Sequence, residues 1–198
     1  VYYVPGVGGH ALYIYPLSQR MPAESELFAL QPPGLDGEQT PAADVPSLAA
    51  HFIEQADFNS DRPLVLMGHS FGGWVVFEMA LQLQAAGKRV DGVVLLDSRA
   101  PTDAALSAGS SKYDDVAKAF ADVYGNDAVA KLTEGDLQAA GEELKTLYGL
   151  LAQRGVLPEG LPESFAARSI RVLVSHLAMN YRPQARFAGR VLELQARD

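Results

Sequence analysis

The chain has 198 residues and a formal net charge of −8, which is enough for one domain with a sizeable core. It has no cysteine, which excludes disulfides, a cysteine nucleophile and thiolate metal sites. The lack of cysteine also fits the reducing cytoplasm, where we expect the protein to work. The acidic balance argues against a nucleic acid or an anionic membrane as partner. No apolar run reaches the roughly 18 residues of a membrane helix, and the abrupt apolar start predicts a domain cut from a longer protein.

Short apolar runs alternate with helical patterns along much of the chain. In chain order, the runs at residues 1–4, 27–30, 64–67, 92–97 and 190–196 predict buried strands. Helical patterns cover about 11–21, 43–57 and 72–87. Because short apolar strands that alternate with helices are typical of α/β proteins, the sequence predicts a mostly parallel sheet with helices on both faces.

Residues of about 101–181 break this alternation. Segments 110–125 and 136–155 have helical patterns, and a third helix is expected over about 162–180. Three helices without a strand predict a helical lid inserted over one end of the sheet, although ordinary helices on the flank of the sheet would give the same pattern. We therefore expect a single domain over 1–198, with its core at about 1–100 and 182–198 and its lid at about 101–181.

A serine lies between the predicted third strand and the helix that follows it. Gly68-His69-Ser70-Phe71-Gly72 fits G-x-S-x-G, the turn that exposes a nucleophilic serine between a strand and a helix. The sharp reversal predicts a strained backbone at Ser70 and glycine two positions before and after it. A plain glycine-rich turn is the alternative, whereas a phosphate-binding loop is disfavoured because the Walker lysine is absent. We predict that Ser70 is a nucleophile.

An aspartate ends the next predicted strand. Asp97 follows Ser70 by 27 residues, and a right-handed crossover through the intervening helix returns the chain to the same edge of the sheet. Asp97 and Ser70 are thus expected within reach of a shared imidazole. Asp97 could instead only cap its following loop, and Asp198, after the last predicted strand, is a rival for the role of acid.

The first predicted strand runs into a glycine-rich loop, "VPGVGGH", at residues 4–10. Such a loop leaves backbone N–H groups free to point at a substrate oxygen. A second donor would be the N–H of Phe71, directly after the nucleophile. The alternative is a simple turn after a strand.

These residues resemble the thioesterase domains of nonribosomal peptide and polyketide synthetases, over most of the chain. The most specific segment is "PLVLMGHSFGGWVVFEMALQLQAAGKRVDGVVLLDSRAP", and "VYYVPGVGGHALYIYPLSQRM", "LFALQPPGLDGEQTP" and "HLAMNYRPQARFAGRVLELQARD" also resemble parts of those domains. The resemblance implies an α/β-hydrolase fold with a helical lid. It also implies that Ser70 accepts an acyl or peptidyl chain from the phosphopantetheine of a carrier protein and releases it by hydrolysis or macrocyclisation, as in antibiotic biosynthesis. The domain would have no cofactor or metal of its own.

The same resemblance assigns roles to individual residues. It makes Ser70 the nucleophile, Asp97 the residue that orients the base, and the backbone N–H groups of Val7 and Phe71 the oxyanion hole. The family's general base is a histidine after its last strand, and no histidine stands there in this sequence. Each histidine present is expected to be structural: His69 precedes the serine and faces away from the role, and the others are His10 in the oxyanion loop, His51 in a surface helix and His176 in the last lid helix. We expect the natural protein to continue beyond 198 and to supply the base there.

Three other functions remain open from the sequence. A free-standing type II editing thioesterase would place its acid at Asp198. A general esterase or lipase is disfavoured by the "LLDSRAP" match. A non-catalytic domain that only binds a carrier protein would explain the missing histidine. The sequence leaves the acyl chain, the oligomeric state and the choice between hydrolysis and macrocyclisation undetermined.

Overall fold

A computed structural model describes residues 1–56, 58, 62–98, 149, 153 and 162–196 of the chain. Within these residues a sheet has the strand order β2-β1-β3-β4-β5, and every neighbouring pair is parallel. The strands are β1 (Tyr2–Val4), β2 (Phe28–Ala29), β3 (Val65–His69), β4 (Gly92–Leu96) and β5 (Val191–Leu194). The parallel sheet predicted from the alternating pattern is confirmed. The burial predicted for the runs at 27–30 and 190–196 is wrong, because β2 and β5 are the two edge strands of the described sheet and their residues are exposed.

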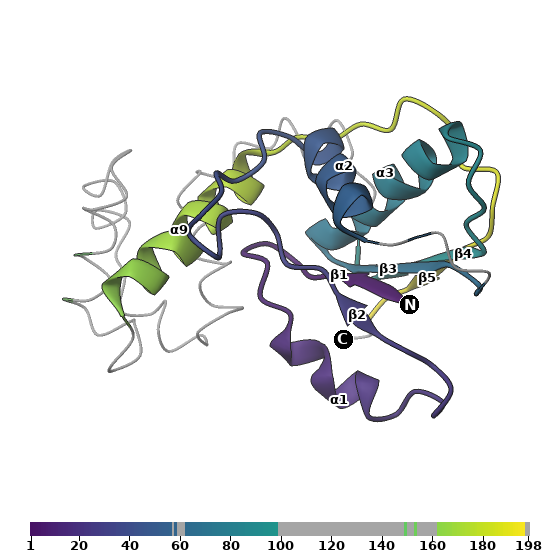
Figure 1. The fold of residues 1–198 in the computed structure, drawn as a ribbon, viewed down its shortest axis with the longest axis horizontal. Helices are drawn as coiled ribbons and strands as arrows, with labels where there is room; N and C mark the ends of the chain where they lie inside the picture. Colours follow the sequence, from purple (N-terminus) through teal and green to yellow (C-terminus); the bar gives the residue numbers. More distant parts are fainter. Residues whose placement is uncertain (57, 59–61, 99–148, 150–152, 154–161, 197–198) are drawn as a thin grey trace.

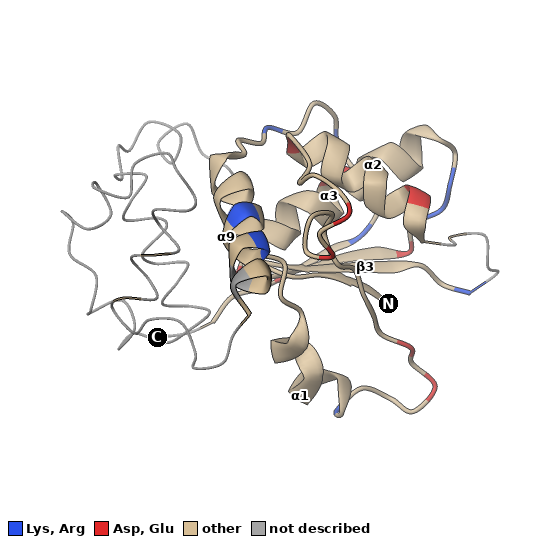
Figure 2. Cartoon of the chain, turned by 60° about the vertical axis from the view of Figure 1, so that its left-hand side comes forward, with Lys and Arg blue, Asp and Glu red and all other residues tan. Residues whose placement is uncertain are grey.

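Two long helices cover one face of the sheet. Helix α2 (Val45–Gln55) is capped by Asp44, whose carboxylate accepts from the N–H of Ser47 at 2.7 Å. Helix α3 (Phe71–Ala85) begins directly after Ser70. Figure 1 shows α3 against the strands with α2 beside it, and the short helix α1 (Tyr15–Ser18) on the other side of the sheet. Figure 2 shows the same arrangement from a second direction.

The helix expected over about 11–21 is largely wrong. The structure has a single 3₁₀ turn, η1 (Leu12–Ile14), followed by the four residues of α1. Pro16 lies in the first turn of α1, where the missing N–H is harmless, but a helix starting at 11 would place that ring in its interior. Leu12 is 90% exposed, so the apolar residues of this segment do not form a buried face.

The hydrophobic core lies between the sheet and the pair α2 and α3. Helix α3 contributes residues all round its circumference, because it packs on the sheet on one side and on α2 on another. Fully buried core side chains include Val4, Leu48, Phe52, Leu66, Val75, Val76 and Met79. The hydrophobic burial of these residues holds β1 and β3 rigidly beneath α3, and these strands carry the glycine loop and Ser70.

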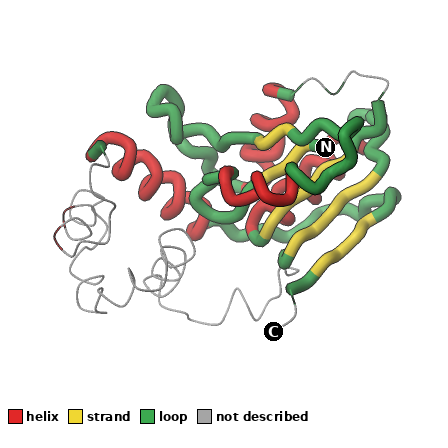
Figure 3. The backbone as a smooth tube through the Cα atoms, turned by 90° about the horizontal axis from the view of Figure 1, so that it is seen from below, coloured by secondary structure: helices red, strands yellow, loops and turns green. Residues whose placement is uncertain are grey.

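The carboxyl ends of the strands meet at one edge. Strands β3 and β4 pair in register with His69 opposite Leu96, so the residues that follow them, Ser70 and Asp97, leave the sheet side by side. Figure 3 shows the strands as one layer, and helix α9 (Glu163–Ala178) lies beyond this edge in Figure 1.

Helix α9 agrees with the helix predicted over about 162–180. The predicted helices at 110–125 and 136–155 lie outside the described residues, and the division into core and lid therefore stays a prediction.

None of the described helices combines the length and the apolar character that a membrane-spanning helix needs.

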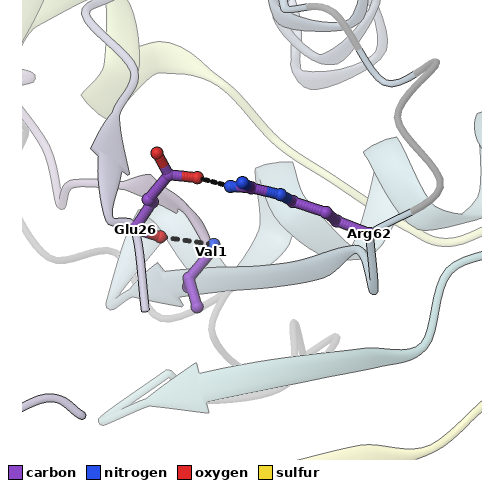
Figure 4. A network of polar contacts seen from close by, with 3 residues as sticks. All are labelled: Val1, Glu26 and Arg62. Atoms are coloured by element: carbon purple, nitrogen blue, oxygen red, sulfur yellow. Dashed lines mark hydrogen bonds and ion pairs between the residues drawn. The ribbon is translucent and has the colours of Figure 1, made fainter. Parts of the chain in front are cut away.

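The opposite, amino edge carries a separate polar cluster. The carboxylate of Glu26 pairs with Arg62, and the backbone oxygen of Glu26 accepts a hydrogen bond from the amino group of Val1 at 2.7 Å (Figure 4). These three residues line an open hollow of about 930 Å³. Because Ser70 follows the carboxyl end of β3, this hollow lies at the other edge of the sheet from the candidate nucleophile.

Candidate active site

Ser70 has a backbone conformation that few L-residues adopt. Its φ and ψ are 50° and −121°, and its side chain is exposed. A Cβ on Gly68 would lie 2.2 Å from the carbonyl oxygen of Gly72, and one on Gly72 would lie 2.2 Å from the carbonyl oxygen of Val4. Only glycine fits at both positions. The structure thus has the strained, exposed serine between two obligatory glycines that the G-x-S-x-G pattern predicted.

Hydrogen bonds on both sides fix the backbone of Ser70. Its N–H donates to the carbonyl oxygen of Leu96 at 2.9 Å. Its carbonyl oxygen accepts from the N–H of Gly73 at 3.0 Å and from the hydroxyl of Ser98 at 2.7 Å. Two of these bonds come from the end of β4, so the serine is held by the same segment that carries Asp97.

Asp97 directly follows β4 and is also exposed. Its φ is 46°, and Ser70 and Asp97 are the two non-glycine residues with positive φ in the described part of the chain. The Asp97 N–H donates to the carbonyl oxygen of Leu194 in β5 at 2.7 Å. The chain therefore turns sharply at the end of each of two neighbouring strands, and both turns present a polar side chain at the same edge. The rival acid, Asp198, lies outside the described residues.

The glycine-rich loop after β1 lies against the serine. A Cβ on Gly6 would be 3.6 Å from the Cβ of Ser70. The carbonyl oxygen of Gly6 accepts from the N–H of Gly9 at 3.1 Å, and Gly8, at the third position of this turn, has a φ of 83°. Val7 therefore lies at the second position of a tight turn next to the candidate nucleophile.

Phe71 is the first residue of α3. The N–H groups in the first turn of a helix have no acceptor within that helix. The Phe71 N–H is therefore available to a ligand oxygen beside Ser70, where the partial positive charge of the helix terminus also favours a negative oxygen. The structure thus brings together the two elements from which the sequence predicted an oxyanion hole.

Helix α9 packs on both of these elements. Leu173 would be 3.5 Å from a Cβ on Gly8, and the ring of His176 stacks on Phe71 at 4.7 Å between centroids. Figure 2 shows basic residues on α9 in blue. Arg168 of this helix donates through Nε to the carbonyl oxygen of Leu35 at 3.1 Å. These contacts dock α9 over the edge where Ser70 is exposed.

The four histidines lie at separate places, and no hydrogen bond joins any of them to the side chains of Ser70 or Asp97 in the part of the chain that the structure describes. Burial lowers the pKa of His176 to about 4, so its imidazole is neutral at neutral pH. Burial also lowers the pKa of His10, whose ring lies 6.1 Å from that of Phe165. His51 is half-buried in α2 rather than fully on the surface.

Two residues of the site were not predicted from the sequence. Ser98 is buried and donates to the Ser70 carbonyl oxygen, and the hydroxyl of Tyr13 contacts both Gly6 and His69. Ser98 directly follows Asp97 in the sequence, and this position next to a candidate site residue was a weak indication of its role. Nothing in the spacing of Tyr13 indicates its contacts, because they depend on how the segment after the glycine loop folds back.

Comparison with known proteins gives one family. The model of the thioesterase domain family matches residues 1–189. The chain is 27% identical over 184 residues to an indigoidine synthase of Dickeya dadantii, covering 91% of this chain and 12% of that protein. It is 33% identical over 147 residues to the thioesterase TesA of Mycobacterium marinum, covering 72% of this chain and 56% of that protein. The chain thus spans only part of the length of these relatives.

Solved structures show the same fold. The Vlm2 thioesterase domain aligns with a TM-score of 0.65 at 20% identity, over 98% of this chain and 73% of that one. The type II thioesterase BorB aligns with a TM-score of 0.61 at 23% identity, over 98% and 71%. A four-domain nonribosomal peptide synthetase aligns with a TM-score of 0.72 at 21% identity, over 100% and 15%. The fold is the α/β-hydrolase fold of thioesterase domains, as the resemblance implied.

Proposed function

This chain belongs to the thioesterase domain family, and on that premise we propose that it is a chain-releasing serine thioesterase with Ser70 as its nucleophile. The observation that carries the proposal is the exposed Ser70, held at a φ of 50° between two positions that admit only glycine. A strained, exposed serine at the end of a parallel strand is the arrangement that presents a hydroxyl to a substrate carbonyl.

The proposed reaction has two steps. In the first, Ser70 Oγ attacks the carbonyl carbon of a thioester, its proton passes to a base, and the thiol leaves with a proton to give an ester on Ser70. In the second, water or a nucleophile within the acyl or peptidyl chain attacks the carbonyl carbon of this ester. Ser70 Oγ then leaves with a proton, which regenerates the free hydroxyl. The N–H groups of Val7 and Phe71 stabilise the negative oxygen that forms in both steps.

The substrate that we propose is an acyl or peptidyl chain carried on the phosphopantetheine of a carrier protein. The similarity to an indigoidine synthase and to a four-domain nonribosomal peptide synthetase supports this class of substrate. The domain itself needs no cofactor for ester exchange. Whether the second step gives an acid or a macrocycle would depend on the shape of the predicted lid and on water exclusion.

Asp97 is proposed to orient a histidine base that lies outside the 198 residues. Each histidine in the chain has a structural neighbour of its own: Phe165 for His10, Phe52 for His51, Tyr13 for His69 and Phe71 for His176. A non-catalytic domain that only binds a carrier protein remains the outcome if no such base exists.

A free-standing editing thioesterase is the second candidate. The similarity to TesA and to the type II thioesterase BorB favours it. The two candidates share the chemistry of Ser70 and differ in the acid, Asp97 or Asp198, and in whether the domain is fused to a synthetase. The length of the full protein and the ranking of the two acids distinguish them.

Labelling of the full-length protein with a fluorophosphonate tests the nucleophile. The wild type should gain one phosphonate, detected by intact mass, and Ser70→Ala should gain none while keeping its thermal midpoint. Ser25→Ala, which removes an exposed hydroxyl in a turn at the other edge of the sheet from Ser70, is the matched control and should label as the wild type does. Labelling that persists in Ser70→Ala would contradict the proposal.

Substitution of the histidines tests the origin of the base. In the full-length protein, His10→Gln, His51→Gln and His176→Gln should each leave the hydrolysis of an acyl-N-acetylcysteamine thioester within about tenfold of the wild type, because loss of a true triad member typically costs far more. A loss of about 10⁴ in one variant that still folds would identify that histidine as the base.

A further inference from the structure

The hydroxyl of Tyr13 connects the glycine loop to the nucleophile turn. The Gly6 N–H donates to this hydroxyl at 2.9 Å, and the hydroxyl lies 2.9 Å from Nδ1 of His69. A phenol can accept one hydrogen bond and donate its single proton at the same time. Tyr13 therefore satisfies both contacts when it accepts from Gly6 and donates to an unprotonated Nδ1 of His69.

Ring packing holds this hydroxyl in place. The Tyr13 ring meets the ring of Tyr3 edge to face, at 6.4 Å between centroids and 83° between planes. It meets the His69 ring in the same manner at 5.4 Å and 68°. Tyr3 belongs to β1 and is fully buried, and His69 is the last residue of β3. Although Tyr13 is 51% exposed, its position is thus set by two adjacent strands of the rigid sheet.

The position of the Tyr13 hydroxyl restrains the direction in which the Val7 N–H points. The carbonyl group of Gly6 and the N–H of Val7 belong to one planar trans peptide, so they point in opposite directions. The Gly9 N–H holds the Gly6 carbonyl oxygen at 3.1 Å, and Tyr13 holds the Gly6 N–H. Gly6 is therefore fixed on both sides, and the plane that carries the Val7 N–H cannot turn freely.

We propose that Tyr13 is a positioning residue, whose hydroxyl holds Gly6 so that the Val7 N–H stays directed at the oxyanion formed on attack by Ser70. This inference rests on the proposed thioesterase function. Gly6 lies directly beside Ser70, since a Cβ on Gly6 would be 3.6 Å from the Ser70 Cβ. Without the hydroxyl, Gly6 N–H loses its acceptor and the loop must find its catalytic orientation during each turnover.

The effect of losing the Tyr13 hydroxyl on kcat and KM follows from the stage of the reaction at which the oxyanion forms. Loss of an oxyanion donor costs about 10²–10³ in kcat, and loss of the group that only orients a donor should cost less, about tenfold. Because the negative oxygen forms only in the transition state, kcat should fall while KM stays within about twofold. A purely structural role for Tyr13 would not produce this split.

The first experiment is Tyr13→Phe in the full-length protein, with Tyr15→Phe as the matched control. Tyr15 lies two residues away, is 62% exposed, and makes no side-chain hydrogen bond to the described residues. Steady-state hydrolysis of an acyl-N-acetylcysteamine thioester and the rate constant for fluorophosphonate inactivation are measured together with the thermal midpoint. Tyr13→Phe should lower kcat and the inactivation rate constant by the same factor, and Tyr15→Phe should change neither.

The second experiment tests the route through His69. His69→Asn keeps an oxygen acceptor near the position of Nδ1, whereas His69→Leu removes it. We expect His69→Asn to stay close to the wild type and His69→Leu to lose kcat as Tyr13→Phe does, with little further loss when both groups are removed.

The outcomes are distinct. Unchanged kcat and inactivation rate in Tyr13→Phe would overturn the inference, as would a rise in KM alone, which would indicate a contact with substrate instead. Failure of the wild type to react with the fluorophosphonate would overturn the proposed function itself.

Discussion

The hydroxyl of Ser98 donates to the backbone carbonyl oxygen of Ser70 at 2.7 Å. This bond links the residue after the candidate acid to the candidate nucleophile. It is also the reason for the third glycine of the turn, because a Cβ on Gly73 would lie 2.0 Å from Ser98 Oγ and 2.5 Å from Ser98 Cβ. Ser98 and Gly73 thus form a matched pair, in which a small residue on α3 leaves space for a hydroxyl that holds the turn.

A double-mutant cycle should reveal this pair. Gly73→Ala should destabilise the protein by about 1–3 kcal/mol through overpacking, and Ser98→Gly should cost about 1 kcal/mol or more through the lost hydrogen bond and lost packing. In the double variant both of these close contacts are gone, and the next neighbour of the new methyl group is Leu95 at 3.4 Å, so the combined loss should be clearly smaller than the sum. Urea unfolding of the wild type, the two single variants and the double variant measures these losses of stability. If the two single losses simply add up in the double variant, the two residues do not interact.

The backbone at Ser70 should be a source of strain. A residue with a side chain at its φ of 50° and ψ of −121° costs about 1–3 kcal/mol relative to an ordinary conformation. Ser70→Gly should therefore be more stable than Ser70→Ala by about 1 kcal/mol, after the greater entropy of unfolded glycine is subtracted. Both variants lack the hydroxyl, so urea unfolding compares the backbone effect alone. Equal stability would show that the turn is relaxed.

The two candidate acids should differ strongly. Asp97→Asn in the full-length protein should lower turnover by about 10⁴, the scale found when an orienting aspartate is lost from a serine triad, because Asp97 leaves β4 beside Ser70. Asp198→Asn should have a far smaller effect. Turnover of an acyl-N-acetylcysteamine thioester is the measurement, and the reverse ranking would favour the editing thioesterase with its acid at Asp198.

His176 should make stability depend on pH. Burial lowers its pKa from 6.5 to about 4, so between these values the unfolded chain binds a proton that the folded protein does not. The free energy of unfolding should therefore decrease as the pH falls from 6.5 towards 4, by at most about 3 kcal/mol.

His176→Phe isolates this contribution. It keeps an aromatic ring against Phe71 but cannot ionise, so its unfolding free energy should depend less on pH in this range. The pKa values of Asp36, Asp44 and Asp91 are also lowered from their ordinary value of 3.8. These carboxyl groups therefore change the free energy of unfolding mainly below pH 3.8, outside the range between pH 6.5 and 4 in which His176 acts. Parallel pH profiles for the two proteins would show that His176 is solvated in solution.

Much of the fold was predictable because it depends on local patterns. Short apolar runs and the helices between them gave the five parallel strands, α2, α3 and α9 within a few residues. The segment after the glycine loop was not predictable in this way. Its apolar residues remain exposed in η1 and α1, so burial does not select a long helix there, and Pro16 prevents one.

The sequence by itself determined the chemistry that is possible at the site: a serine between obligatory glycines, an aspartate after the next strand and a glycine loop after the first. Each of these follows from spacing along the chain, since a reversal from strand to helix requires small residues at fixed positions. Tertiary structure alone decided what holds them. Ser98 reaches the Ser70 carbonyl and Tyr13 reaches Gly6 and His69 because parallel strands far apart in sequence end at one edge, and a hydrogen bond between such residues leaves no periodic trace in the sequence.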